Sequence, residues 1–485
     1  RSGRVTGVQT CALPISKSKL TISRLILGVA VTSLITGCTT ALSIMPENPP
    51  PEMVVPELWS TEHNSTVESI NNSWFGELNS PPLENLINEA LQHNQEIQIA
   101  NLTWRAAEQN ALITGTNTNL KSELGVSGKR VQTLSSTNKK VFTTTHSLDL
   151  STSWEMDLWD RLSKQQQAAV VRQKASHADL EAARFSLAAK VARSWFRTID
   201  ATQQIKIAEE RVTSYEHALE VITARQRVGL VDILDLHLSK SEVAIAEERL
   251  ASREMEQRES IRTLESLLGR YPGADKKLIA SLTQNQLSIT ASQIPSGLPS
   301  QLLERRADIV ASRERMLAAG LDAEIAASNR LPSFSLTAKT GTSSEELHNI
   351  LDFNYLVWSL IGNLTQPLFQ QDRLKAEEML NKIKHREAWF NHSKTLLTAF
   401  QEVENALSAD KYQQRRVEAL TRAANESQAA AKLALSRYEI GLSDIITLLD
   451  AQRRSYDRES ARLTAIAKQI DNRILLHLAL GGGYV

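Results

Sequence analysis

Apolar residues recur along this chain at alternating steps of three and four, which is the pattern of a coiled-coil seam. One series without a miss runs through Ala168, Val171, Ala175, Ala178, Ala182, Phe185, Ala189, Ala192, Phe196 and Ile199. After a phase shift the pattern resumes with Ile205, Ala208, Val212, Tyr215, Leu219 and Ile222. Because neither proline nor glycine interrupts Asp160 to Val228, we expect one helix there. At 1.5 Å per residue, about 69 residues would extend on the order of 100 Å.

A glycine follows this helix and permits the chain to reverse. Gly229 can adopt the left-handed backbone conformation that ends many helices, and a second helix is expected from about Asp232 to Leu268. The same plan returns later in the chain. A helix is expected from about Asp372 to Ile440, with Gly441 at the turn and a return helix to Leu480.

Two pairs of strand-length segments lie between the helices. The first pair, Leu120 to Val131 and Val141 to Trp154, flanks a polar tip at Gln132 to Lys140. The second pair is about Ser333 to Thr342 and Phe353 to Thr365. Tilted transmembrane strands need about 9–11 residues with alternating faces, so these hairpins fit a membrane sheet. Four strands cannot close a barrel alone, and such a sheet requires several subunits. Soluble hairpins that cap a coiled coil are the alternative.

The two halves of the chain resemble each other at one constant offset of 212 positions. Gly229-Leu230-Val231-Asp232 returns as Gly441-Leu442-Ser443-Asp444. Glu96-Ile97 returns as Asp308-Ile309, and Leu268-Gly269 returns as Leu480-Gly481. Solenoid repeats are only about 20–50 residues long, so the duplicated unit is a whole folded half. We expect the first half at 81–269, a connector at 270–303 and the second half at 304–485.

The N-terminal region has the layout of an export signal. Basic residues precede the apolar run Leu25 to Ile35, which ends at Ile35-Thr36-Gly37-Cys38. That ending resembles the lipobox of bacterial lipoproteins, in which the cysteine is lipidated and begins the mature chain. We therefore expect a lipoprotein signal at 17–37, lipidation at Cys38 and a lipidated segment at 38–80, with 1–16 a non-native leader. Thr39 favours outer-membrane delivery in such proteins. An ordinary signal peptide is the alternative.

Charge and motif content argue against nucleic-acid binding and enzymatic chemistry. Beyond Gly37 the chain holds 50 basic and 55 acidic residues, and of its two cysteines only Cys38 remains. An acidic balance disfavours nucleic acid as a partner, and a single thiol excludes an internal disulfide. The common phosphate-binding, zinc-protease and serine-hydrolase motifs are missing. The ten histidines form no ligand-spaced cluster. We expect neither a metal nor a cofactor.

Four features together resemble the bacterial outer-membrane factors of tripartite efflux and secretion systems, the TolC/OprM-like family. They are the lipobox at Cys38, the segment Leu302 to Ile309, the strand exits Trp159-Asp160-Arg161 and Phe369 to Arg373, and the turn Arg437 to Asp444 continuing to Gln452. The match is closer to the lipidated branch of the family. Ala307 stands where family patterns often have proline, which affects only a local turn.

The resemblance implies a mostly α fold with a small β part. Three chains would form an α-helical tunnel across the periplasm and share a 12-stranded outer-membrane β-barrel. Such a homotrimer, anchored in outer-membrane lipid, would passively conduct drugs or other small solutes. It would receive them from a periplasmic adaptor protein and an inner-membrane RND-type pump. The adaptor would contact the helix tips at Gly229, Leu230, Gly441, Leu442, Ser443 and Asp444.

The resemblance also implies a gate at the periplasmic mouth. Asp450 matches an aspartate that would form a ring of three carboxylates under threefold symmetry, and like charges in a narrow aperture repel one another and attract cations. Tyr438 and Asp235 match positions that link neighbouring helices. Thr447 stands where the unlipidated branch has a second aspartate, and Ser443 where it has an arginine. A solvated helix-face aspartate is the alternative for Asp450.

Two alternatives to a drug channel remain at the level of sequence. One is an exit duct for type I protein secretion, which the same architecture would serve. The other is a lipid-anchored structural coiled coil, which explains the heptads and Cys38 but neither the paired hairpins nor the duplication.

Overall fold

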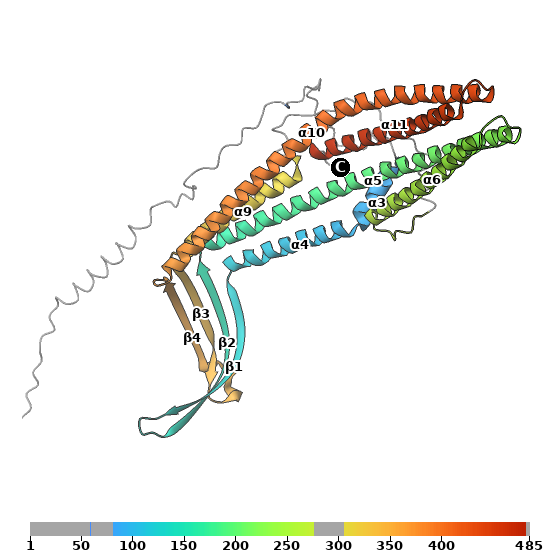
Figure 1. The fold of residues 1–485 in the computed structure, drawn as a ribbon. Coiled ribbons are helices and arrows are strands. Elements are labelled where there is room, and N and C mark those ends of the chain that lie inside the picture. Colours follow the sequence, from blue (N-terminus) through green and yellow to red (C-terminus); the bar gives the residue numbers. More distant parts are fainter. Residues whose placement is uncertain (1–58, 60–80, 276–304, 482–485) are drawn as a thin grey trace, which may run out of the picture. The chain divides into compact units, whose positions relative to one another are not determined.

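The computed structural model describes residue 59 and residues 81–275 and 305–481. The expected signal, the lipidation site Cys38 and most of the connector lie outside these described residues. The described part is mostly helical and carries one small sheet (Figure 1). This confirms the predicted fold class of a mostly α protein with a small β part.

The first half of the chain runs from two short helices through a hairpin into two long helices. Its elements, in order, are α3 (Pro81–His93), α4 (Gln95–Gly115), the 3₁₀ turn η1 (Thr116–Thr118), β1 (Lys121–Leu134), β2 (Lys140–Met156), α5 (Arg161–Arg227) and α6 (Ile233–Leu267). α3 and α4 are separated only by Asn94, whose side-chain oxygen accepts hydrogen bonds from the first amides of α4. This N-cap lets the chain change direction without leaving those amides unpaired.

The second half repeats this order. Its elements are α9 (Ala307–Ser328), β3 (Ser333–Ser344), the 3₁₀ turns η3 (Leu347–Asn349) and η4 (Phe353–Tyr355), β4 (Leu356–Thr365), α10 (Gln371–Glu439) and α11 (Ile445–Ala479). α9 begins 212 positions after α4, and α11 begins and ends 212 positions after α6. The offset read from the sequence is therefore also an offset between elements of the fold.

The four strands form one antiparallel sheet in the order β1-β2-β3-β4. The central pair β2–β3, which joins the two halves, runs from His146↔Ser344 to Met156↔Phe334. Within the described residues β1 and β4 each have a single neighbouring strand, so the sheet has two open edges. All four strands leave the helices at the same end of the helical part (Figure 1).

The first hairpin is longer than the sequence predicts. The strands continue to Leu134 and begin again at Lys140, so the loop spans only 135–139 and not Gln132 to Lys140. Polar composition misled the prediction, because serine, threonine and lysine side chains do not prevent the backbone from pairing. The fourth strand is shorter than predicted: Asp352 accepts a hydrogen bond from the Asn354 amide and caps a 3₁₀ turn before Leu356.

Helix α5 is the central element of the helical part. It packs against α3, α4, α6, α9 and α11, while α10 packs on α9 and α11. Seven members of the predicted ten-residue seam are buried, and Val171, Ala182 and Phe185 are half-buried. A second buried stripe contains Leu187, Val191 and Trp195. The repeated alanines let neighbouring helices approach closely, which suits a helix that is contacted on several sides.

Buried side chains gather in three clusters along the helices. One lies where α3, α5 and α6 meet, with Ile470 and Ile474 of α11. A second joins Ile309 of α9 to α10 and α11. The third, formed by Ile222, Ala434, Tyr438, Ile445, Leu448 and Leu449, lies next to the two glycine turns. It holds the end of α5 against α10 and α11, and so positions the candidate functional site.

Candidate functional site at the helix turns

The turn between α5 and α6 is a glycine-terminated helix end. Gly229 has φ 72°, its amide donates to Gln226 O at 3.0 Å, and the Leu230 amide donates to Arg225 O at 3.0 Å. This pair of bonds is a Schellman motif, which satisfies the last carbonyls of a helix. A Cβ atom on Gly229 would meet no heavy atom within 4 Å. The glycine is therefore required by backbone conformation and not by lack of space.

The turn between α10 and α11 has the same construction. Gly441 has φ 78°, its amide donates to Tyr438 O at 3.0 Å, and the Leu442 amide donates to Arg437 O at 2.8 Å. A Cβ here would also point into open space. The two turns thus share both sequence and hydrogen-bond pattern.

An aspartate caps the helix that follows each turn. Asp232 accepts a hydrogen bond from the Leu234 amide at 3.0 Å, and Asp444 accepts one from the Thr447 amide at 2.6 Å. The hydrogen bonds from Thr447 hold the pKa of Asp444 below its ordinary value. Asp444 and Thr447 therefore shape the turn, and Ser443 beside them is half-buried.

Large apolar side chains at both turns remain exposed to solvent. Leu230 is 74% exposed and Leu442 is 75% exposed. Their exposed neighbours are Val228, Ile233, Leu234, Ile440 and Ile446. Clustered exposed apolar residues mark interaction sites more often than isolated ones do. The turns together offer an apolar surface that nothing in the described chain covers.

Tyr438 links the ends of α5 and α10. Its ring is buried, and the guanidinium carbon of Arg225 lies 4.8 Å from the ring centroid. Arg225 Nη2 also donates to the Glu439 carbonyl oxygen at 2.6 Å. The Tyr438 hydroxyl is buried without a hydrogen-bond partner among the described residues. Burial raises the pKa of Tyr438, Arg225 opposes this, and the negative charge of Asp235 adds to the rise.

Asp450 is paired within its own helix. Its carboxylate oxygens lie 2.6 Å from Arg453 Nη2 and 2.7 Å from Arg454 Nε, and its side chain is 33% exposed. Asp450, Arg453 and Arg454 together therefore carry a net charge of +1. The two arginines follow Asp450 at i+3 and i+4, a helical spacing that places side chains side by side.

A polar cluster on the same helices was missed by the sequence analysis. Arg211 of α5 is 4% exposed, and its Nη1 lies 3.2 Å from Asp457 Oδ1 of α11. Arg249 Nη1 of α6 lies 3.0 Å from the same oxygen. The ring of Tyr215 packs edge-on against Tyr456 with centroids 6.3 Å apart. Three helices thus meet at one carboxylate.

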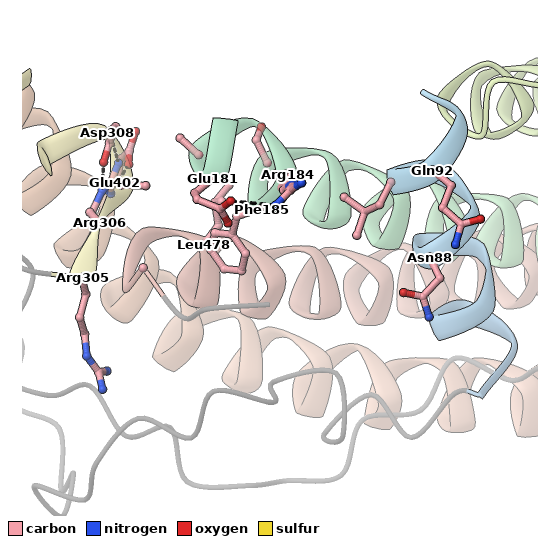
Figure 2. Close-up of a pocket in the computed structure, with 15 residues that line it drawn as sticks. Asn88, Gln92, Glu181, Arg184, Phe185, Arg305, Arg306, Asp308, Glu402 and Leu478 are labelled. Carbon is pink, nitrogen blue, oxygen red and sulfur yellow. Dashed lines mark hydrogen bonds and ion pairs between the residues drawn. The ribbon is translucent and has the colours of Figure 1, made fainter. Parts of the chain in front are cut away.

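One cavity of the described chain lies away from the turns. It has a volume of about 650 Å³ and is shown in Figure 2. In it, Arg306 Nη1 lies 2.7 Å from Glu402, and its Nη2 lies 2.7 Å from Asp308. Burial alone would lower the pKa of Arg306, but these two carboxylates raise it above its ordinary value. The group is an ion-paired clamp between α9 and α10 and contains no nucleophile paired with a base.

No group of three or more metal-ligating side chains occurs in the described part of the chain. No helix within 81–275 or 305–481 combines the length and hydrophobicity needed to cross a bilayer.

Comparison with known proteins identifies the family. The family described as "Outer membrane efflux protein" matches residues 86–270 and 298–482. The chain is 27% identical over 446 residues to the pyoverdine export outer membrane protein OpmQ of Pseudomonas putida, covering 90% of this chain and 94% of that protein. It is 26% identical over 464 residues to the cation efflux system protein CusC of Escherichia coli, covering 95% and 98%.

Solved structures give the same assignment. The open state of the Neisseria gonorrhoeae MtrE outer membrane channel superimposes with a TM-score of 0.80 at 26% identity, over 90% of this chain and 98% of that one. The chain therefore belongs to the outer membrane efflux protein family and is an outer-membrane channel component of an efflux system.

Proposed function

We propose that three copies of this chain form the exit channel of a tripartite efflux assembly. The observation that carries the proposal is the pair of open sheet edges: β1 and β4 each have one neighbouring strand within the described residues. Unpaired backbone groups are too costly to leave in lipid. Pairing β1 of one copy with β4 of the next satisfies both edges. Three copies with four strands each give a closed sheet of twelve.

The outer strands carry the side chains expected for lipid contact. Leu124 and Val126 on β1 are 73% and 71% exposed. On β4 the large exposed residues are Leu356, Val357, Trp358, Leu360, Ile361 and Leu364. A monomer in water rarely leaves so much apolar surface uncovered. Lipid and a neighbouring copy together would cover it.

The helical part has matching apolar stripes on its two outer helices. On α4 the exposed residues are Ile99, Leu102, Leu112 and Ile113. On α10, Ile383, Phe390 and Leu397 follow one another at seven-residue intervals and are 58%, 50% and 59% exposed. A seven-residue repeat is the mark of a helix that packs on another helix. Contact between α4 of one copy and α10 of the next would bury both stripes.

The exposed glycine turns support a partner at the far end of the helices. Leu230 and Leu442 offer an apolar surface to a periplasmic adaptor, which would connect the channel to an inner-membrane RND-type pump. Lipidation at Cys38 would anchor each copy in the outer membrane. Substrates cross without bond chemistry. The cargo is a small solute, and the pyoverdine and cation systems of the relatives define two classes to test.

Electrophoresis and bilayer recording test the proposal together. The mature protein, extracted from outer membranes, should migrate as a heat-sensitive trimer and produce discrete conductance steps in planar bilayers. Val126→Pro removes a backbone donor at the β1 edge, while Val228→Pro changes an exposed helix end far from the sheet. The trimer should be lost only in the first variant. A stable monomer without pore activity would disprove the proposal.

Screening a deletion strain for accumulation of dyes, biocides, siderophores and metal ions would then identify the cargo.

A further inference from the structure

We propose that the outer part of the β1–β2 hairpin binds the phosphate groups of the phosphorylated glycolipid in the outer leaflet, lipopolysaccharide. This part, residues 129–145, is called the hairpin extension. The inference rests on the proposed function, which places the strand ends remote from the helices at the outer surface of the membrane.

The hairpin extension projects beyond the rest of the sheet. The β2–β3 ladder stops at His146↔Ser344. The β1–β2 ladder continues from Lys129↔Thr145 to Leu134↔Lys140 without a third strand beside it (Figure 1). β4 has only 10 residues against 14 in β1. A neighbouring β4 therefore cannot cover the whole edge of β1, and the extension stays open to its surroundings.

A well-formed turn fixes the end of the extension. The Ser135 amide donates to Lys139 O at 2.9 Å, and the Asn138 amide donates to Ser135 O at 2.8 Å. Asn138 has φ 58°, a conformation that asparagine tolerates better than most residues. The basic side chains that flank the turn are thus held on an ordered scaffold.

The extension is strongly and uniformly basic. It carries Lys129, Arg130, Lys139 and Lys140, all exposed, and the chain has no acidic residue from 124 to 148. None of the four forms an ion pair with a described residue. The nearest acid along β2, Asp149, is already bound to Lys339 Nζ at 3.0 Å. Four positive charges therefore lack a counter-charge in the described chain.

Apolar side chains accompany these charges on one face. The strand register places Arg130, Leu134, Lys140 and Phe142 on the same side of the hairpin. The Arg130 guanidinium carbon lies 5.3 Å from the centroid of the Phe142 ring. Phe142 is 56% exposed and Leu134 is 66% exposed. Basic groups beside exposed aromatic and aliphatic groups suit the boundary between lipid chains and charged headgroups.

Phosphate is the chemistry that best matches this face. Guanidinium groups bind phosphate oxygens in a two-pronged geometry, and lysines add point charges. The alternative partner for these basic side chains is the acidic loop of the second hairpin in a neighbouring copy. This loop carries Glu345, Glu346 and Asp352. That loop also has exposed apolar side chains, Leu347, Leu351 and Phe353, so the experiment below is designed to separate it from lipid. Lipid supplies both the phosphate and the cover.

The test compares two variants with equal charge changes on the full mature trimer in detergent. The extension variant combines Lys129→Gln, Arg130→Gln, Lys139→Gln and Lys140→Gln. The control variant combines Lys411→Gln, Arg415→Gln, Arg416→Gln and Lys432→Gln, all exposed positions on α10. The probes are purified lipopolysaccharide, the same lipid after removal of its phosphates, and inorganic phosphate. Binding is measured by the shift in trimer melting temperature and by the lipid retained after purification.

We expect wild type and the control variant to bind intact lipopolysaccharide equally. The extension variant should bind it about tenfold more weakly or worse, because several charge-assisted contacts are lost together. The dephosphorylated lipid should bind the wild type as weakly as the intact lipid binds the extension variant. Inorganic phosphate should not shift the melting temperature.

Three results would overturn the inference. Equal binding by both variants would exclude the extension as the site. A melting shift with inorganic phosphate equal to that with lipid would indicate an isolated phosphate site. Loss of the trimer in the extension variant, with no lipid effect in wild type, would show that the basic residues pair with acids of a neighbouring copy. A wild-type protein that forms no trimer or pore would instead contradict the proposed function, so the two failures are distinguishable.

Discussion

Arg211 and Asp457 form an ion pair that holds α11 against α5. Arg211 is buried, with its Nη1 3.2 Å from Asp457 Oδ1, whereas the Asp457 side chain is 47% exposed. The Nε and Nη2 groups of Arg211 have no partner among the described residues. Asp457 is therefore the acceptor on which a buried guanidinium depends, and Arg249 reaches it from a third helix.

Asp457→Ala should loosen the contact between α5 and α11. Removing one partner leaves the other buried and unpaired, which we expect to cost about 1.5–3 kcal/mol, the range for hydrogen bonds to charged groups. Trimer melting should fall, and channel conductance should rise if α11 lines the closed mouth. Arg249→Gln removes only the half-exposed ion pair between Arg249 and Asp457. It should lower the free energy of unfolding by about 0–1 kcal/mol. Equal losses in the two variants would contradict this order.

Gly229 and Gly269 both have positive φ, but only at Gly269 would an added Cβ collide with neighbouring atoms. Alanine substitutions at the two positions therefore separate backbone strain from steric clash. Gly229→Ala places an L-residue at φ 72° in open space, which we expect to cost about 1–2 kcal/mol. Gly269→Ala meets the same positive φ, and its Cβ would also lie 2.7 Å from His93 O. Thermal melting should show the larger loss for Gly269→Ala. Adaptor binding, measured by pull-down, should instead be reduced more by Gly229→Ala, because of these two glycines only Gly229 lies at the exposed tip.

The gate residues yield a prediction about charge. Asp450→Ala combined with Tyr438→Phe should raise single-channel conductance in planar bilayers. It should also favour anions, because Arg453 and Arg454 lose the carboxylate they share. Most of the effect should come from Asp450.

A single-variant series separates the two contributions. Tyr438→Phe alone should change little, since its hydroxyl has no partner within the described chain and the ring still faces Arg225. Tyr438→Ala should have a larger effect, because it removes that ring. Unchanged conductance and selectivity in Asp450→Ala would count against the gating role of this residue.

The sequence predicts the seam of α5 well in its first part and poorly in its second. There the apolar pattern includes Val212, which is only half-buried. The buried series is instead Gln204, Ala208, Arg211, Tyr215, Ala218 and Ile222. Its steps also alternate between four and three, but two of its members are polar. A search for apolar periodicity cannot find seam positions that are filled by hydrogen-bonded or ion-paired side chains.

The remaining differences have similar physical causes. The turns at Gly229 and Gly441 could be predicted because positive φ strongly selects glycine. The arginines that pair with Asp450 follow it at helical spacing and could have been noticed. The ion-pair partner of Arg211 could not, because Asp457 lies 246 positions away on another helix. Long-range polar contacts leave no periodic trace in a single sequence.

Glu378 makes the junction between the helices and the sheet sensitive to acid. Its carboxylate is 8% exposed and lies 2.6 Å from Arg330 Nη1 and 2.8 Å from Lys382 Nζ. Burial alone would raise the pKa of Glu378, but the hydrogen bonds and charges of Lys382 and Arg330 outweigh it and lower the pKa below the ordinary value of 4.5. A lowered pKa means that the folded state binds this proton less readily than the unfolded chain does.

The sign of the pH dependence follows from that difference. The stabilisation by Glu378 is complete above pH 4.5 and is lost as the pH falls through the lowered pKa. Trimer melting of the wild type should therefore decline on acidification below that value. Glu378→Gln should melt lower at neutral pH and show a flatter profile in acid. Glu377→Gln removes the neighbouring exposed pair with Arg373 and should leave the wild-type profile intact. Parallel acid profiles for wild type and Glu378→Gln would show that other carboxylates control the transition.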